Sequence, residues 1–385
     1  MMFSTSSQLI IMVPILPEIG ATLGVNQFWR GMLLTSYAVA LAGSALLVGP
    51  ASDRIGRRRV LLLGTGLMTV TLALHTVAAD YELLLIMRIL AGIGGGMLSG
   101  GSVAYIGDYF PYEQRGWANG WVMSGTALGQ VAGVPLGKVL ATAFGYRWPF
   151  LGFALTMAGA TVLIWRYVPS PEADLDPERV TFRRGIRKYR RVLNDATARA
   201  AVGSYVLMFF GFGLLTTFLP TWLETSIGLS SYEVALLFAI GGLGNILAAP
   251  SAGRLSDTIG RKPIIVWTSA LLGVIMLVTP YMVSGFYSVA VLFFGAMATV
   301  GMRIGPLQSL LTALVPDRQR GLLMGLAVGA GQGGFGFGSF VAGLTFGPLG
   351  YVSNAIGAAC SAFAMALLVQ QRLPEPAMDQ AASRA

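Results

Sequence analysis

The chain has 385 residues, of which 55% are hydrophobic and only 11% are charged. A soluble globular protein carries charge on roughly a quarter of its residues, so this composition excludes an ordinary soluble domain and favours a polytopic membrane protein. The net charge of +9 does not predict nucleic-acid binding, because the basic residues gather in short segments between apolar stretches.

Twelve apolar stretches follow one another along the chain. Each is long enough to cross a hydrocarbon core of about 30 Å as a helix. Charges, Gly and Pro separate the stretches and no alternating strand pattern occurs, so we predict an all-α membrane protein of twelve transmembrane helices, not a barrel. The predicted segments are residues 3–22, 30–51, 58–79, 82–109, 115–142, 148–168, 199–224, 232–252, 261–283, 286–314, 320–345 and 350–370.

The first segment is short at its beginning. Pro17 lies 16 residues from Met1, whereas the matching Pro220 stands about 21 residues into the seventh predicted segment. We therefore expect the natural start to lie upstream of Met1.

A charged turn with glycines joins the second and third segments and returns between the eighth and ninth. The two aspartates are 204 residues apart, and so are the glycines that follow them. Glycine permits a sharp backbone turn, and the arginines can face lipid phosphate or water. The residues of the two copies are Gly49, Asp53, Arg54, Gly56, Arg57 and Arg58, then Gly253, Asp257, Gly260 and Arg261.

This repetition predicts a duplicated chain. The pattern Pro-x-x-Gln-Arg-Gly likewise occurs at Pro111 and again at Pro316. Two parallel six-helix repeats would hold a substrate site between them, near the middle of the membrane. The predicted parts are a first bundle (1–168), a cytoplasmic linker (169–198), a second bundle (199–370) and a cytoplasmic tail (371–385).

The basic residues are unevenly placed along this topology. With the N-terminus inside, 21 of the 26 Lys and Arg residues fall on the cytoplasmic side. Arg30, Lys138 and Arg147 are expected at or near the outer face, and Arg88 and Arg303 lie within segments. This excess follows the positive-inside rule, so we expect both termini in the cytoplasm.

The pattern Gly-x-x-x-Asp-Arg-x-Gly-Arg-Arg between the second and third segments resembles the signature loop of the major facilitator superfamily. The resemblance covers nearly the whole chain and implies a secondary transporter. It also implies that Asp53 caps the eleventh helix and that Arg57 pairs with Asp108 at the end of the fourth. Because Asp108 aligns with Ala313, we expect this inner-face network in the first half only.

Two arginines lie inside predicted helices. Arg88 stands about 9 Å from the outer end of the fourth helix, and a charge at that depth tends to face the bundle interior or a wet cavity. Its motif resembles the fourth-helix motif of the superfamily, whose arginine is implicated in proton coupling. Arg303 in the tenth helix has no counterpart in the first half. We expect it either to contact the substrate or a coupling group, or to extend its charge towards the inner face.

The fifth segment carries a row of small residues that predicts close helix packing and gating. Gly125, Gly129 and Gly133 share one face, and Pro135 interrupts the helical hydrogen bonding. The antiporter subgroup of the family has a proline where this chain has Gln130. The neighbouring motifs resemble the arabinose- and sugar-efflux branch of the drug:proton antiporters.

Titratable groups within the segments are few. Glu18, beside Pro17, is the carboxylate nearest to mid-membrane, so Glu18 with Arg88 is the expected proton-coupling pair. His75 is expected to be a packed or interfacial residue. Polar and aromatic residues on helices that face the interface in this family are candidates for the substrate cavity: Gln8, Tyr37, Ser99, Tyr105, Gln130, Tyr205, Phe209, Asn245, Gln308 and Gln332.

These patterns predict a plasma-membrane (bacterial inner-membrane) transporter that exports a small drug-like or sugar-like solute in exchange for protons. An uptake symporter or facilitator on the same fold is the alternative, and a transport-inactive sensor or a polytopic enzyme is a third. No metal cluster, phosphate loop or catalytic set stands out in the sequence, so we expect no enzymatic activity and no cofactor beyond the coupling proton. The expected partners are a small molecule and the lipid bilayer, without nucleic acid, for a monomeric protein.

Overall fold

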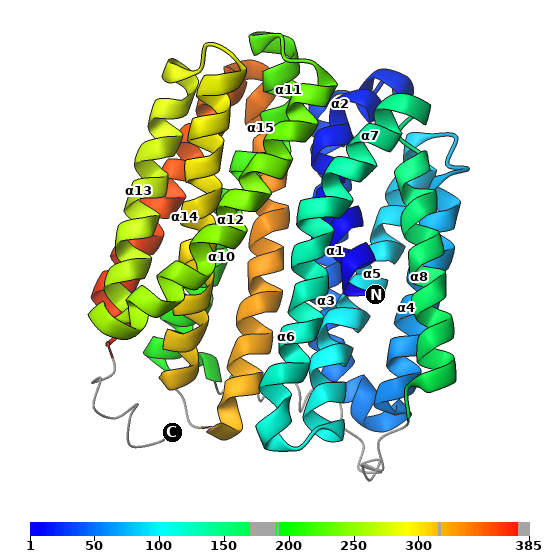
Figure 1. The fold of residues 1–385 in the computed structure, drawn as a ribbon, viewed down its shortest axis with the longest axis vertical. Helices are drawn as coiled ribbons and strands as arrows, with labels where there is room; N and C mark the ends of the chain where they lie inside the picture. The colour runs from blue at the N-terminus through cyan, green and yellow to red at the C-terminus, as the bar shows by residue number, and fades with distance from the viewer. Residues whose placement is uncertain (170–189, 191, 315–316, 376–385) are drawn as a thin grey trace. The chain divides into compact units, whose positions relative to one another are not determined.

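The computed structural model describes residues 1–169, 190, 192–314 and 317–375 (Figure 1). Helices account for nearly all of these residues, and no strand occurs among them. The predicted all-α membrane fold is therefore confirmed. The chain forms two compact units, Met1–Ile186 with Ser230–Ala235, and Arg187–Leu229 with Leu236–Ala385. The first division falls inside the predicted linker 169–198, most of which lies outside the described residues, and the exact domain limits remain predictions.

The helices before the linker account for the first six predicted segments. α3 packs against α5, and α4 packs against α5 and α8. α1 contacts α6, η1, α7 and α8. The elements are α1 (Met2–Ile10), α2 (Met12–Leu23), α3 (Gln27–Ile55), α4 (Arg57–His75), α5 (Tyr81–Tyr109), α6 (Tyr112–Leu128), η1 (Gly129–Gly133), α7 (Val134–Phe144) and α8 (Trp148–Tyr167).

The first predicted segment is a broken helix. α1 and α2 meet at Ile11 and are bent by 50°. Pro14 and Pro17 have no backbone N–H, so the carbonyls of Ile10 and Val13 lose their usual helical donors, which accounts for a break at this place.

The helices after the linker account for the other six segments. α10 packs along α15, and α13, α14 and α15 lie side by side (Figure 1). The elements are α10 (Ala196–Thr217), α11 (Leu219–Trp222), η2 (Leu223–Ile227), α12 (Ser231–Ile259), α13 (Arg261–Met282), α14 (Phe286–Ala313) and α15 (Asp317–Arg372).

Nine helices in the described part of the chain are long and apolar enough to cross a membrane, or ten if α1 and α2 form one span. α15 contains two predicted segments, because its backbone leaves the helical conformation at Gly350 (φ 69°, ψ −172°). α4 has the length of a span but begins with three arginines. Dividing α15 and including α4 gives the twelve predicted segments.

The duplication is visible in the backbone itself. Six glycines of the described chain have a positive φ, and they form three pairs: Gly24 with Gly228, Gly56 with Gly260, and Gly145 with Gly350. The members of each pair are 204, 204 and 205 residues apart. At these turns a residue with a Cβ would be strained, so both copies depend on glycine for the direction in which the next helix leaves.

Candidate functional site

The first charged turn forms the predicted ion pair. Gly56 (φ 96°) separates α3 from α4, and the next residue, Arg57, donates from Nε to Oδ2 of Asp108 at 2.6 Å. Arg57 also hydrogen-bonds the Ser52 hydroxyl, and Arg58 donates to the Trp165 carbonyl at 2.5 Å. This network ties α4 to the end of α5 and to α8.

Other residues of that turn are not described in atomic detail. The side chains at Asp53 and Arg54, and the surroundings of Gly49, lie outside the described part of the structure. The capping role of Asp53 and the gating role of the whole turn therefore remain predictions.

The second charged turn has a carboxylate that the sequence did not predict. Glu375 accepts hydrogen bonds from the backbone N–H groups of Arg261 (2.8 Å) and Lys262 (2.7 Å), so it caps the beginning of α13. The Arg261 guanidinium donates to the Ser309 carbonyl at 3.2 Å. The expected restriction of the inner-face network to the first half remains a prediction: Glu375 comes from beyond α15 and not from the aligned position, Ala313, and the hydrogen bonds that it accepts come from backbone N–H groups.

Arg88 lies inside the first unit and is fully buried. Its guanidinium hydrogen-bonds the Gln8 side-chain oxygen and lies 3.4 Å from the Gln8 carbonyl oxygen. It also lies 4.9 Å from the centre of the Tyr37 ring and 5.7 Å from that of Phe150. Two predicted cavity residues and the predicted coupling arginine are thus in contact. Phe150 was not among the predicted cavity residues, and the signal that could have found it is its place at the end of the motif Gly145-Tyr146-Arg147-Trp148-x-Phe150, which follows the fifth segment. His75 is packed as expected, with its ring 4.6 Å from that of Phe150.

The expected coupling pair of Glu18 with Arg88 remains a prediction. Glu18 lies on α2, beyond the bend that follows Gln8, and the hydrogen bonds of Arg88 go to Gln8. A second buried cation is hydrogen-bonded to the helix that carries Glu18. Lys138 is 2% exposed and donates to the carbonyl of Pro14, one helical turn before Glu18, at 2.7 Å.

The predicted position of Lys138 at or near the outer face remains a prediction, while its side chain is buried inside the first unit. The apolar and glycine-rich flanks of this lysine were the signal that it packs against a helix.

The glycine row of the fifth segment packs against α1, as predicted. Ser7 donates to the carbonyl of Gly129 at 3.0 Å. A Cβ at Gly129 would lie 2.6 Å from the Phe3 carbonyl oxygen, and one at Gly125 would lie 3.5 Å from the Met2 Cβ. The row ends in the π-helix η1, which contains Gln130 and Gly133 and precedes Pro135. A proline cannot donate to the residue four positions earlier, which favours this wider turn.

Arg303 lies in the middle of α14 and is 2% exposed. Its Nη1 atom lies 3.9 Å from the Met365 sulfur. Elsewhere in this unit Tyr205 and Phe209 stack with their ring centres 6.2 Å apart. The charge of Arg303 therefore points into the bundle and does not extend to the inner face.

The remaining cavity candidates have varied surroundings. Tyr105 donates to the Pro169 carbonyl at 2.9 Å, and Ser99 bonds within its own helix. Gln308 is exposed, and Asn245 and Gln332 are half-buried. The candidates belong to both units, so a shared substrate cavity remains a prediction.

Comparison with known proteins agrees with this architecture. Residues 1–230 and 201–385 match the Major Facilitator Superfamily. The chain is 24% identical over 385 residues to the uncharacterized MFS-type transporter YceJ of Bacillus subtilis (strain 168), covering 100% of this chain and 97% of that protein. It is 24% identical over 317 residues to the multidrug resistance protein MdtG of Yersinia enterocolitica, covering 80% and 76% of the two chains.

A solved structure shows the same fold. The D-xylose-proton symporter superposes with a TM-score of 0.81 at 19% identity, over 98% of this chain and 96% of that one. With both repeats matched and the helical units in place, this chain belongs to the Major Facilitator Superfamily of membrane transporters.

Proposed function

We propose that this protein exports a small drug-like or sugar-like solute across the bacterial inner membrane in exchange for protons. The observation that carries the proposal is the fully buried Arg88, held by Gln8 and two aromatic rings inside the first unit. A buried charge in a membrane helix is costly and commonly marks an ion or substrate pathway. The similarity to a protein named for multidrug resistance supports the direction of transport.

In this proposal Glu18 carries the coupling proton. Glu18 is half-buried on α2, and the buried ammonium of Lys138 is attached to the same helix one turn earlier, at Pro14. Arg88 fixes α1 through Gln8, so the bend at Ile11 separates a segment held by Arg88 from one held by Lys138. Protonation of Glu18 would remove a negative charge beside Lys138 and bias the packing of α2.

The orientation and assembly state are also proposals. The basic residues of the connecting segments support cytoplasmic termini. A monomer suffices, because the two repeats already supply both halves of an alternating-access transporter. Acting on a solute without chemical conversion, the protein would not be an enzyme.

The test is solute flux in proteoliposomes with an imposed pH gradient, using a panel of cationic drugs and neutral sugars. The proposal expects solute to move in the direction opposite to proton flow. This solute flux should stop when a protonophore dissipates the pH gradient. Glu18→Gln should retain solute binding but lose the response to the gradient.

Co-movement of solute and protons would instead favour the uptake symporter. The presence of Gln130, where the antiporter subgroup has a proline, favours the uptake symporter as the second candidate function. A solute flux that does not change with a pH gradient of either sign would contradict proton coupling.

A further inference from the structure

Among the described residues each unit buries one arginine, and the two arginines have different surroundings. Arg88 contacts two oxygen atoms of Gln8 and the faces of two aromatic rings. Arg303 has a single hydrogen bond within the described chain, the one to the Met365 sulfur. A thioether is a weak acceptor, so the charge of Arg303 is far less compensated than that of Arg88.

No described carboxylate neutralises Arg303. The salt bridge of Arg57 with Asp108 belongs to the other unit. The acidic residues of the second unit whose side chains are described lie at the ends of helices, whereas Arg303 lies in the middle of α14: Asp195, Glu224, Asp257 and Glu375. A guanidinium keeps its proton in proteins, and a buried cation without a counter-charge is strongly unfavourable.

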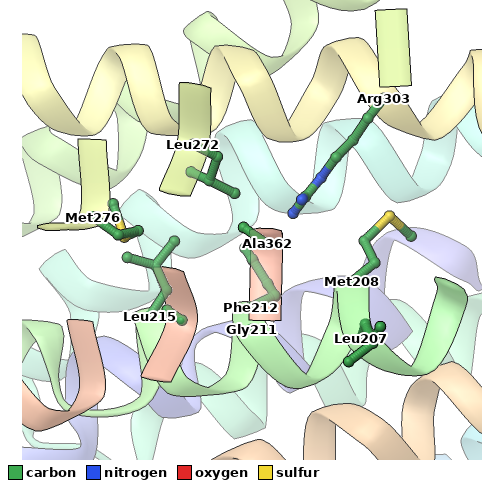
Figure 2. A pocket seen from close by; sticks show the side chains of 10 residues that line it. Leu207, Met208, Gly211, Phe212, Leu215, Leu272, Met276, Arg303 and Ala362 are labelled. Atoms are coloured by element: carbon green, nitrogen blue, oxygen red, sulfur yellow. The ribbon is translucent and has the colours of Figure 1, made fainter. Parts of the chain in front are cut away.

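The Arg303 guanidinium points into a small cavity inside the second unit. Figure 2 shows the side chain extending from α14 towards Ala362 and Met208. The other walls come from α10, α13 and α15, and they include Leu215 and Met276. The cavity has room for about one water-sized particle, and Arg303 is its one charged lining residue.

We propose that this cavity is a binding site for one small monovalent anion of the halide class, with chloride as the physiological ligand. The sign follows from the guanidinium, and the volume fits a single atom better than a carboxylate with its carbon chain. The apolar lining disfavours strongly hydrated anions such as sulfate or phosphate, because their lost hydration would not be replaced. The site is independent of the direction of transport.

A second small cavity suggests how an ion reaches the site. It shares Leu215 and Met276 with the first cavity and continues past Thr279 to Tyr351. Thr279 lies in the last turn of α13, so this second cavity leads towards the end of the bundle. Motion of the unbranched Met276 side chain would connect the two cavities.

The test is thermal unfolding of the purified full chain in detergent, at constant ionic strength, with sodium chloride or sodium bromide replacing sodium gluconate. We expect a saturable rise of the unfolding midpoint, by roughly 3 °C when the halide reaches one hundred times its dissociation constant. Crystals grown in bromide should give an anomalous peak beside the Arg303 guanidinium.

Three variants separate the site from a general salt effect. Arg303→Met should abolish the halide dependence while unfolding at or above the wild-type midpoint in gluconate, since an apolar side chain of similar length needs no counter-charge. Arg303→Lys should keep the dependence at lower affinity, and remains informative if Arg303→Met fails to fold. Ser269→Ala is the matched control, because Ser269 is buried and bonds the same Met365 sulfur without carrying charge.

The proposal is overturned if wild-type protein unfolds identically in chloride and gluconate, as it would if water alone solvates the guanidinium. A halide effect that persists unchanged in Arg303→Met overturns it as well, because the ion would then bind elsewhere. Both results leave the proposed transport activity untouched, which is measured separately by flux.

Discussion

The Nε atom of Arg57 lies 2.6 Å from Oδ2 of Asp108, which joins the first residue of α4 to the end of α5. The two side chains are 16% and 30% exposed, so solvent partly screens their attraction. A pair of this kind contributes only about 0.2–1 kcal/mol to stability. Its larger effect is expected on conformation, if the turn opens and closes during transport.

We therefore expect Asp108→Asn to reduce solute flux severalfold while lowering the unfolding midpoint by little. Arg57→Asp combined with Asp108→Arg should restore part of the flux. Arg59→Ala is the control, since Arg59 is an exposed cation of the same turn. Equal flux in wild type, Asp108→Asn and Arg59→Ala would remove the pair from the mechanism.

The cap on α13 should contribute to stability. Replacing Glu375 by Ala removes two backbone hydrogen bonds and a negative charge at a helix N-terminus, so we expect a loss of about 1 kcal/mol in the free energy of unfolding. Gln371→Ala, an exposed change at the same end of α15, should have little effect. Calorimetry of the three proteins in one detergent distinguishes them, and indistinguishable curves would contradict the cap.

Arg88 and Gln8 should behave as one energetic unit. Gln8→Leu removes the side-chain oxygen acceptor of the guanidinium and keeps only the backbone carbonyl of residue 8, so we expect a loss of about 1–3 kcal/mol. Arg88→Met combined with Gln8→Leu should be more stable than Gln8→Leu alone, because the uncompensated charge is gone. Transport should stay low in the double variant, which separates the coupling role from the structural one. Additive stability changes across the cycle would show that the two residues do not interact.

The packing of η1 on α1 should tolerate no side chain. In Gly133→Ala the new methyl group would overlap Ser7, so we expect destabilisation by about 1–3 kcal/mol, with partial recovery when Ser7→Gly is added. Gly66→Ala is the matched control, since a Cβ at Gly66 meets nothing within 4 Å. Denaturant or thermal unfolding measures both, and an equal response at the two glycines would contradict the close contact.

The proposed topology can be read by cysteine labelling. In a Cys360→Ala background, an impermeant thiol reagent applied to sealed right-side-out cells should modify Ser284→Cys and spare Arg59→Cys. The opposite pattern would reverse the orientation of every span.

The fold could be predicted because its signals are local. Length and apolarity mark each span, and glycine marks the turns at Gly56 and Gly260 that both copies share. Contacts between distant elements gave no such signal. Glu375 meets Arg261 across 114 residues, and Lys138 meets Pro14 across 124. The contact of Arg57 with Asp108 was predicted from the family resemblance, because the periodicity of the sequence does not indicate which distant residues pair.

The candidate site was predicted in part for the same reason. Gln8, Tyr37 and Arg88 were chosen from three different helices, and they meet in the first unit. Glu18 was chosen for its depth along the sequence, and it lies on α2, beyond the bend at Ile11, whereas Gln8 lies on α1. The helical rise per residue predicts how deep a residue lies in a straight helix, but it does not predict a bend such as the one at Ile11.

The three pairs of glycines with positive φ mean that each half of the chain contains its own set of glycine-dependent turns. If the chain were divided in the linker, each of the two fragments would contain all three of its own positive-φ glycines. Such fragments, expressed from separate genes, should insert into the membrane independently and together restore transport. The covalent linker would then ensure equal amounts of the two halves and would not be needed for their folding.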